Sequence, residues 1–282
     1  MTSPDDTNLS GTDTDSERGG SARRGALECN GVGFTWPIDA YERSVVLKDI
    51  SLDVADGEFV SILGPSGCGK TTLLKILCGL LRPESGEVWV RGRRVDGPRK
   101  ELGIVFQDYG LFPWLTVQKN TEFAMKMNGV SRIERTLRAC HLLERVGLSA
   151  CRNSYPHQLS GGMRQRASIA RVLASDADCL LMDEPFAALD YQTRLYMQRF
   201  LSDIWREFRK TIVFVTHQIE EALALSDRVF LMSACPGRIS EVVTVQLSRP
   251  RDISCMEFNQ YRARVLAHLE REVSGTFGER PE

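Results

Sequence analysis

The sequence predicts an α/β fold in which a mainly parallel sheet is flanked by helices. Short apolar segments that are typical of buried strands alternate with amphipathic helical patterns along most of the chain. A glycine-rich turn joins one of these strands to a helix. The stretch from about 108 to 176 is mostly helical and interrupts the alternation, which indicates a helical subdomain.

The first elements follow from periodicity. Residues 1–25 contain almost nothing to bury, so we expect a disordered tail there, with regular structure beginning near Leu27. Apolar and polar residues alternate over 50–54, as in a half-buried strand. A tight turn at 56–57 then leads into 58–63, where nearly every residue is apolar, as expected for a strand covered on both faces.

The remaining elements repeat this pattern. Leu73, Leu77, Leu80 and Leu81 predict a helix that Pro83 closes. Amphipathic helices are also predicted over 163–174 and 201–208. Further strands are predicted at 88–90, 102–106, 179–182, 212–215 and 229–232.

Composition limits the classes of function. The chain has 282 residues, 42% of them hydrophobic and 26% charged, and its formal net charge is −1. This balance gives no general attraction to nucleic acid, whose binding surfaces are usually visibly basic. No segment approaches the roughly 20 apolar residues that cross a bilayer, and the N-terminus has no signal-like pattern. We therefore expect a cytosolic chain without a nucleic-acid partner.

Residues 64–71 match the pattern G-x-x-x-x-G-K-[ST], between a buried strand and an amphipathic helix. The glycines let successive N–H groups point at phosphate oxygens, and the helix N-terminus adds partial positive charge. Lys70 can reach the outer phosphates, and the Thr71 hydroxyl can bind Mg²⁺. The flanking strand and helix disfavour a chance match. The predicted nucleotide-binding residues are Gly64, Pro65, Ser66, Gly67, Cys68, Gly69, Lys70, Thr71 and Thr72.

Two adjacent acids end the predicted strand at 179–182. Their position is the carboxyl edge of the sheet, where open α/β sheets bind ligands. We expect Asp183 to hold Mg²⁺, directly or through water, and Glu184 to polarise the water that attacks the γ-phosphate. The alternative is that one of the acids only caps the next turn.

A second candidate anion site lies at 159–166. Gly161 and Gly162 open a helix, and Ser160 at its N-cap leaves backbone N–H groups free to bind an anion. Alone, this would be an ordinary N-cap. Because it precedes the strand of Asp183 by about twenty residues, the combination is specific, and from about 27 to 270 the chain resembles the ABC ATPase family.

The resemblance implies a P-loop NTPase core of mainly parallel sheet, with an antiparallel β part and a helical signature subdomain at about 108–176. It places the ATPase domain at 27–247 and a C-terminal helical extension and tail at 248–282. In this family two subunits bury two ATP molecules between them. Ser160, Gly161 and Gly162 would thus act in trans, on the ATP held by the partner of a homodimer.

Four further positions match functional residues of the family. Gln107 corresponds to the glutamine that contacts Mg²⁺ and the attacking water, and Asp190 belongs to the loop that communicates across the dimer. His217 corresponds to the histidine that hydrogen-bonds the γ-phosphate, although a lone histidine is more often structural. Trp36 stands where an aromatic residue stacks on adenine; with Phe34 close by, a core role is the alternative.

Family membership alone does not fix the function, because related ATPases serve DNA repair and translation. Those relatives carry two cassettes, a long coiled coil or zinc-binding cysteines, whereas this chain has one phosphate loop and neither of the other features. Residues 107–117 resemble the importer branch for nitrate, taurine and aliphatic sulfonates, and so do 236–239 and 249–251. Cys235 departs from the arginine expected in that branch.

The resemblance implies an ATPase at the cytoplasmic face of the membrane that drives import of a small anionic solute. Its partners would be transmembrane permease subunits and, indirectly, a solute-binding protein. Phe112, Pro113 and Trp114 would dock a short cytoplasmic helix of the permease, unless Phe112 and Trp114 are core residues of the helical subdomain. The alternative functions are an ATPase of a soluble non-transport complex and a regulatory subunit without turnover.

Overall fold

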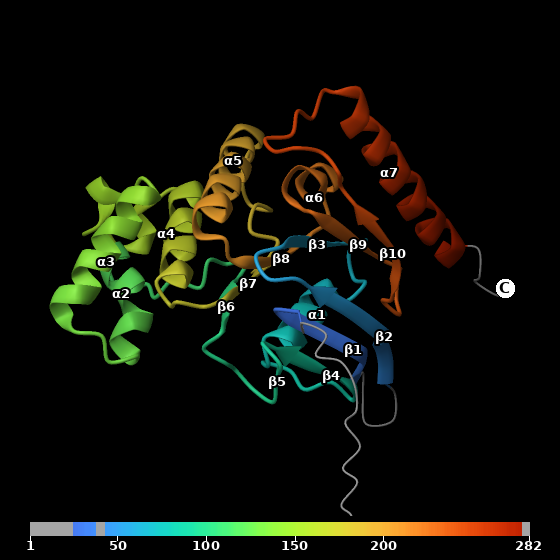
Figure 1. Ribbon diagram of the computed structural model, residues 1–282, viewed down its shortest axis with the longest axis horizontal. Helices are drawn as coiled ribbons and strands as arrows, with labels where there is room; N and C mark the ends of the chain where they lie inside the picture. Colours follow the sequence, from blue (N-terminus) through green and yellow to red (C-terminus); the bar gives the residue numbers. More distant parts are fainter. Residues whose placement is uncertain (1–24, 38–42, 278–282) are drawn as a thin grey trace, which may run out of the picture.

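The computed structural model describes residues 25–37 and 43–277, and this part of the chain contains a six-stranded sheet and a four-stranded sheet (Figure 1). The six strands lie in the order β10-β9-β3-β8-β7-β6. Neighbouring strands are parallel except at the β9–β10 edge, so the mainly parallel sheet is confirmed. The bounds are β3 (Phe59–Leu63), β6 (Leu102–Val105), β7 (Cys179–Asp183), β8 (Thr211–Thr216), β9 (Arg228–Met232) and β10 (Ile239–Thr244).

The four-stranded sheet is antiparallel and has the order β2-β1-β4-β5. It corresponds to the antiparallel β part that the family resemblance implies. Its strands are β1 (Leu27–Pro37), β2 (Arg43–Val54), β4 (Ser85–Val90) and β5 (Arg93–Arg94). The predicted tail at 1–25 lies, apart from Gly25, outside the described residues.

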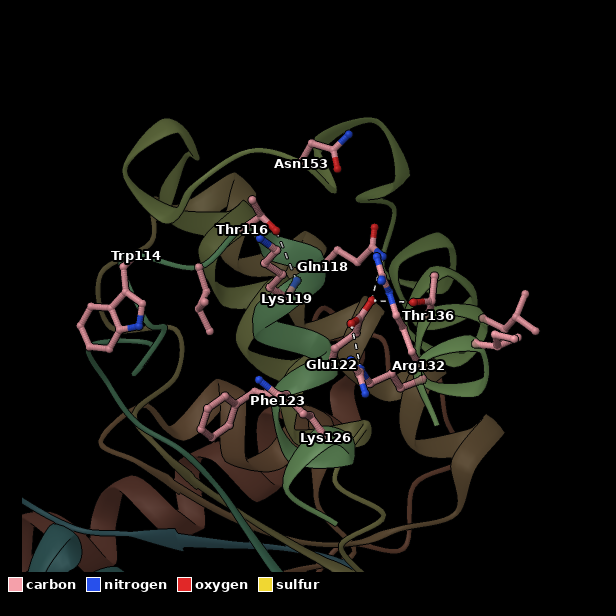
Figure 2. Close-up of a pocket in the computed structure, with 14 residues that line it drawn as sticks. Trp114, Thr116, Gln118, Lys119, Glu122, Phe123, Lys126, Arg132, Thr136 and Asn153 are labelled. Carbon is pink, nitrogen blue, oxygen red and sulfur yellow. Dashed lines mark hydrogen bonds and ion pairs between the residues drawn. The ribbon is translucent and has the colours of Figure 1, made fainter. Parts of the chain in front are cut away.

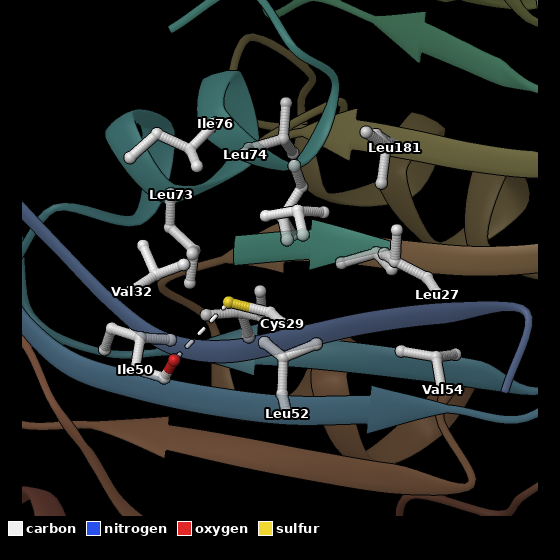
Figure 3. Close-up of a cluster of buried hydrophobic side chains, with 14 of the residues drawn as sticks. Leu27, Cys29, Val32, Ile50, Leu52, Val54, Leu73, Leu74, Ile76 and Leu181 are labelled. Atoms are coloured by element: carbon white, nitrogen blue, oxygen red, sulfur yellow. Dashed lines mark hydrogen bonds between the residues drawn. The ribbon is translucent and has the colours of Figure 1, made fainter. Parts of the chain in front are cut away.

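Helix α1 (Lys70–Leu77) packs against residues of both sheets. Leu73 and Leu74 contribute to one buried cluster together with Leu27 of β1 and Leu181 of β7 (Figure 3). Burial of these apolar side chains stabilises the junction of the two sheets and fixes the helix that follows the phosphate loop.

The predicted C-terminal end of this helix is wrong. The helix ends at Leu77, and Leu80 and Leu81 lie beyond it. Gly79 adopts a positive φ of 77°, and a Cβ added there would lie 2.3 Å from the carbonyl oxygen of Gly97. The chain therefore turns at Gly79, before Pro83 can act as the terminator.

The opposite face of the parallel sheet is covered by α5 (Tyr191–Phe208) and the helical subdomain. Leu201, Ile204 and Trp205 of α5 are buried in one cluster with Phe59 and Phe214 of the sheet, as the periodicity predicts. The strand β3 is thus buried on both faces, which explains its nearly continuous apolar sequence.

The helices within 108–176, the range predicted as a helical subdomain, lie on the side of the molecule away from the C-terminal helix (Figure 1). Buried Asn120 bonds backbone groups of Phe112, Leu115 and Thr116, and so fixes the segment that precedes the first helix. The bounds are α2 (Val117–Met127), α3 (Arg132–Arg145), η1 (Ser149–Cys151), η2 (Pro156–Gln158) and α4 (Gly161–Leu173).

The C-terminal extension folds back on α6 (Ile219–Leu225) and ends in α7 (Met256–Phe277). Arg251 donates to the backbone carbonyl oxygens of Leu223 and Ser226, and burial lowers the pKa of its guanidinium to about 10. Arg249 pairs with Asp227. Among the described residues, no helix has the length and apolar character needed to cross a membrane.

Candidate nucleotide site

The phosphate loop lines a cleft of about 330 Å³ at the N-terminus of α1. Gly69 adopts φ 97° at this helix start, and a Cβ there would lie 2.7 Å from Leu47 Cδ2, so only glycine fits. The cleft brings together residues far apart in the sequence: Trp36, Val46, Ser66, Gly67, Gly69, Lys70, Thr71, Thr72 and Glu184.

The side chain of Lys70 lies inside the loop. It is 5% exposed, and its Nζ donates to the carbonyl oxygens of Gly64 and Pro65, each at 2.8 Å. Cys68 is buried, and burial raises the pKa of its thiol. Of the predicted loop residues, Gly64, Pro65 and Cys68 do not line the cleft.

Two predicted metal ligands meet at the base of the loop. The Thr71 hydroxyl donates to Asp183 Oδ1 at 3.1 Å, across 112 positions of sequence. Burial raises the pKa of Asp183, the charge of Glu184 raises it further, and the bond from Thr71 opposes both. A hydroxyl and a carboxylate are the hard oxygen donors that Mg²⁺ prefers, so the residues present fit this ion.

Glu184 holds an unusual backbone conformation, with φ 43°. Its N–H donates to the carbonyl oxygen of Val215 on β8, which ties the residue to the sheet edge. Strain of this kind in a non-glycine residue typically persists at functional sites. Glu184 Oε2 lies 2.9 Å from Nδ1 of His217, so adjacent parallel strands place these two predicted catalytic residues together.

Other predicted residues lie away from this cleft. Gln107 is exposed after β6 and does not line it. Ser160 and Gly162 line a separate depression of about 360 Å³ at the start of α4. Asp190 caps α5 by accepting from the Thr193 backbone N–H, and this bond lowers the pKa of Asp190. One copy of the chain therefore does not unite the phosphate loop with the Ser160 turn.

The sequence reasoning missed Arg194. Its Nη2 donates to the carbonyl oxygen of Leu189 at 2.9 Å, and its Nη1 donates to Gln218 Oε1 at 2.8 Å. Its Nε lies 3.6 Å from Glu221, a carboxylate that is 3% exposed and whose pKa burial raises. One guanidinium thus joins the loop before Asp190 to the residue after His217. Nothing in the sequence around Arg194 distinguishes it from any other arginine on a predicted helix, so its contacts with Leu189, Gln218 and Glu221 could not be predicted.

We expect Arg194→Met to lower the kcat of ATP hydrolysis by about tenfold with little change in KM for ATP. The change leaves the carboxylate of Glu221 buried without its cation, and it removes the hydrogen bond that holds Gln218, the residue after His217. The phosphate loop is unchanged. Arg199→Met is the matched control, because Arg199 is exposed on the same helix. Steady-state kinetics with wild-type values for Arg194→Met would contradict the bridging role.

A second concave surface lies on the helical subdomain. Residues 114–116, α2, the first turns of α3 and Asn153 line a groove of about 920 Å³, which we call the subdomain groove (Figure 2). Trp114 is 70% exposed at one side of it, so the core interpretation is wrong for this residue. Phe112 is half-buried, and its ring centroid lies 5.6 Å from that of Trp114 and 4.5 Å from that of Phe123.

This fold and the phosphate-loop site define a P-loop nucleoside triphosphatase. Residues 47–187 match the ABC transporter family model, and the chain belongs to this family. It is an ATP-binding subunit with ATPase chemistry, as predicted, and the alternative of a soluble non-transport complex finds no support.

Two relatives and one solved structure illustrate the similarity. A nitrate import ATP-binding protein of Synechocystis is 48% identical over 72% of this chain and 76% of its own length. A taurine import ATP-binding protein of Roseobacter denitrificans is 45% identical over 76% of this chain and 80% of its own. A dimeric ATP-binding cassette in a post-hydrolysis state with ADP and Pi superposes with TM-score 0.68 at 32% identity, over 79% of this chain and 100% of the other. The predicted resemblance to the importer branch is confirmed.

Proposed function

We propose that this chain drives the import of a small anionic solute of the nitrate or sulfonate type, as the ATPase subunit of a transporter whose membrane subunits are separate chains. The observation that carries the proposal is that the subdomain groove, with its exposed Trp114, lies on the same chain as the ATP cleft. An ATPase that acts alone has no use for such a surface. The names of the nitrate and taurine import relatives support the class of solute.

ATP binding closes a head-to-tail dimer in our proposal. The phosphate loop of one copy and the Ser160 turn of the other bind the same ATP, and Trp36 stacks on its adenine. The separation of these two features within one copy supports this arrangement, and so does the dimer seen in the solved relative. Closure of the dimer moves the attached membrane subunits.

Thr71 and Asp183, with Gln107 approaching on closure, would hold Mg²⁺. The ion supplies positive charge that offsets the charge of the β- and γ-phosphates. Hydrolysis itself depends on positioning. Glu184 orients and deprotonates the attacking water, and His217 aligns the Glu184 carboxylate through the bond at Nδ1 and contacts the γ-phosphate.

The subunit works at the cytoplasmic face of the membrane, where the subdomain groove receives a short helix of the permease. A solute-binding protein on the other side delivers the solute and, together with the permease, determines its identity. The apolar surface of Trp114, whose ring packs against Phe112, is suited to burying a side chain of the partner.

The test is purification of tagged Glu184→Gln protein with Mg-ATP from detergent-solubilised native membranes, followed by mass spectrometry. We expect a multi-span permease to be recovered in stoichiometric amount, because the variant retains ATP in the closed dimer. Recovery of only soluble or nucleic-acid partners would leave the ATPase chemistry intact and refute the transport assignment.

Trp114→Ala should reduce recovery of the membrane subunits by about tenfold or more, since exposed aromatic side chains often dominate an interface. The ATPase activity of the isolated protein should not change, because Trp114 lies outside the ATP cleft. Met256→Ala, which removes an equally exposed apolar side chain from α7, is the control. Equal recovery for both variants would contradict docking at Trp114.

A further inference from the structure

The subdomain groove has a definite pattern of charge. Its lining residues include four basic side chains and a single acidic one, Glu122. Glu122 is already satisfied, because Gln118, Thr136 and Arg135 all donate to its carboxylate (Figure 2). The groove therefore has an excess of positive charge that its own carboxylate does not offset.

Three of the four cations have no ion-pair partner within residues 25–37 and 43–277. Arg135 pairs with Glu122 at 3.3 Å, but Lys119, Lys126 and Arg132 form no ion pair with any residue in the described part of the chain. All three are exposed. Elsewhere on α3, by contrast, Arg138 pairs with Glu134.

The cations flank an aromatic side chain in a regular way. Lys119, Phe123 and Lys126 are spaced four and three residues apart on α2, which puts them on one face of the helix (Figure 2). The Cα atoms of the two lysines are thus separated by about two helical turns, or about 10 Å along the axis. Phe123 lies between them and contacts the Phe112 ring.

We propose that the groove selects a helix of the membrane subunit that carries two acidic side chains two turns apart, on either side of an apolar residue. The inference rests on the proposed function, because it assumes that a permease helix occupies the groove. The acids pair with Lys119 and Lys126, the apolar residue covers Phe123, and Trp114 closes one side. Complementary charge fixes the register of such a helix and disfavours partners with basic helices.

A peptide fits this surface better than an anionic bilayer. The cations line a concave groove that also presents the polar side chains of Gln118 and Asn153, which can bond a peptide backbone or side chain. A bilayer surface is flat on this scale, and its headgroups would leave the exposed part of Phe123, a lining residue of the groove, uncovered.

The first experiment identifies the occupant. Benzoylphenylalanine is placed at position 114 of the full-length chain, and the protein is photo-cross-linked in native membranes with Mg-ATP. The cross-linked peptide is then sequenced by mass spectrometry. We expect a cytoplasmic segment of a membrane subunit with Asp or Glu at positions seven residues apart and an apolar residue between them. A permease segment without this pattern would refute the charge inference and leave the proposed function standing. Cross-links to lipid or soluble proteins alone would refute both.

The second experiment reverses the charge. Lys119→Glu combined with Lys126→Glu should lower recovery of the membrane subunit by about tenfold, because two attractions become repulsions. Replacing the two acids of the cross-linked membrane segment by lysine should restore recovery of the membrane subunit by this double variant. The control is Lys100→Glu with Lys210→Glu, the same change in net charge away from the groove. Both double variants should keep wild-type ATPase activity and melting temperature. Undiminished recovery for the groove variant, or no rescue by the exchange, would overturn the proposal.

Discussion

Glu184→Gln is expected to lower ATP turnover by about 10³-fold while ATP binding is retained. The amide cannot take a proton from the attacking water, and loss of a positioned general base typically costs 10²–10⁴-fold. Thr71, Asp183 and the phosphate loop are unchanged, so the nucleotide stays bound. We therefore expect a dimer that persists with Mg-ATP and dissociates with Mg-ADP, measured by light scattering coupled to size-exclusion chromatography.

The control for this prediction is Glu134→Gln, which removes an exposed carboxylate of α3 whose one ion pair among the described residues is with Arg138. It should hydrolyse ATP at the wild-type rate and show no persistent dimer. Rapid hydrolysis by Glu184→Gln would remove this residue from the mechanism. The bond to His217 would then have to be explained as a structural contact.

Lys70→Ala is expected to weaken ATP binding by about 10- to 150-fold. The side chain supplies a positive charge inside a loop otherwise built from backbone groups, and a charge-assisted hydrogen bond contributes about 1.5–3 kcal/mol. Lys70 reaches the carbonyl oxygens of Gly64 and Pro65, so its ammonium lies where the outer phosphates must enter. Isothermal titration calorimetry with ATP measures the change.

The same substitution tests the dimer. Lys70→Ala combined with Glu184→Gln should abolish the persistent dimer, because closure requires ATP in the phosphate loop. Lys100→Ala, an exposed lysine outside the cleft, should bind ATP like the wild type. Normal affinity in Lys70→Ala would exclude the phosphate loop as the nucleotide site.

Much of the site is predictable because its parts are local. Lys70 and Thr71 are set by consecutive residues between one strand and one helix. Asp183 and Glu184 end a strand that its apolar sequence identifies, and the parallel order β3-β8-β7 brings that strand end to the loop. Positions that match the family motifs, such as His217, could be assigned by resemblance, and the structure places His217 Nδ1 2.9 Å from Glu184 Oε2.

Other features were not predictable, and the reasons are physical. The helix ends at Leu77, and the Gly79 backbone that follows packs so close to Gly97, a residue from a separate turn, that it leaves no room for a Cβ. Arg194 resembles any other helical arginine until Leu189 and Gln218 are brought beside it. The exposure of Trp114 could not be foreseen either, because the segment around it is fixed by hydrogen bonds between buried Asn120 and the backbone of Phe112.

By itself, the sequence determined the class of the fold, the nucleotide chemistry and the family. These follow from apolar periodicity and from motifs whose residues are neighbours in the chain. The tertiary structure alone decided which separate segments meet, which cations remain unpaired in the subdomain groove, and that the phosphate loop and the Ser160 turn lie apart. The physical reason is that ion pairing and exposure depend on the directions of side chains from different elements, which only packing fixes.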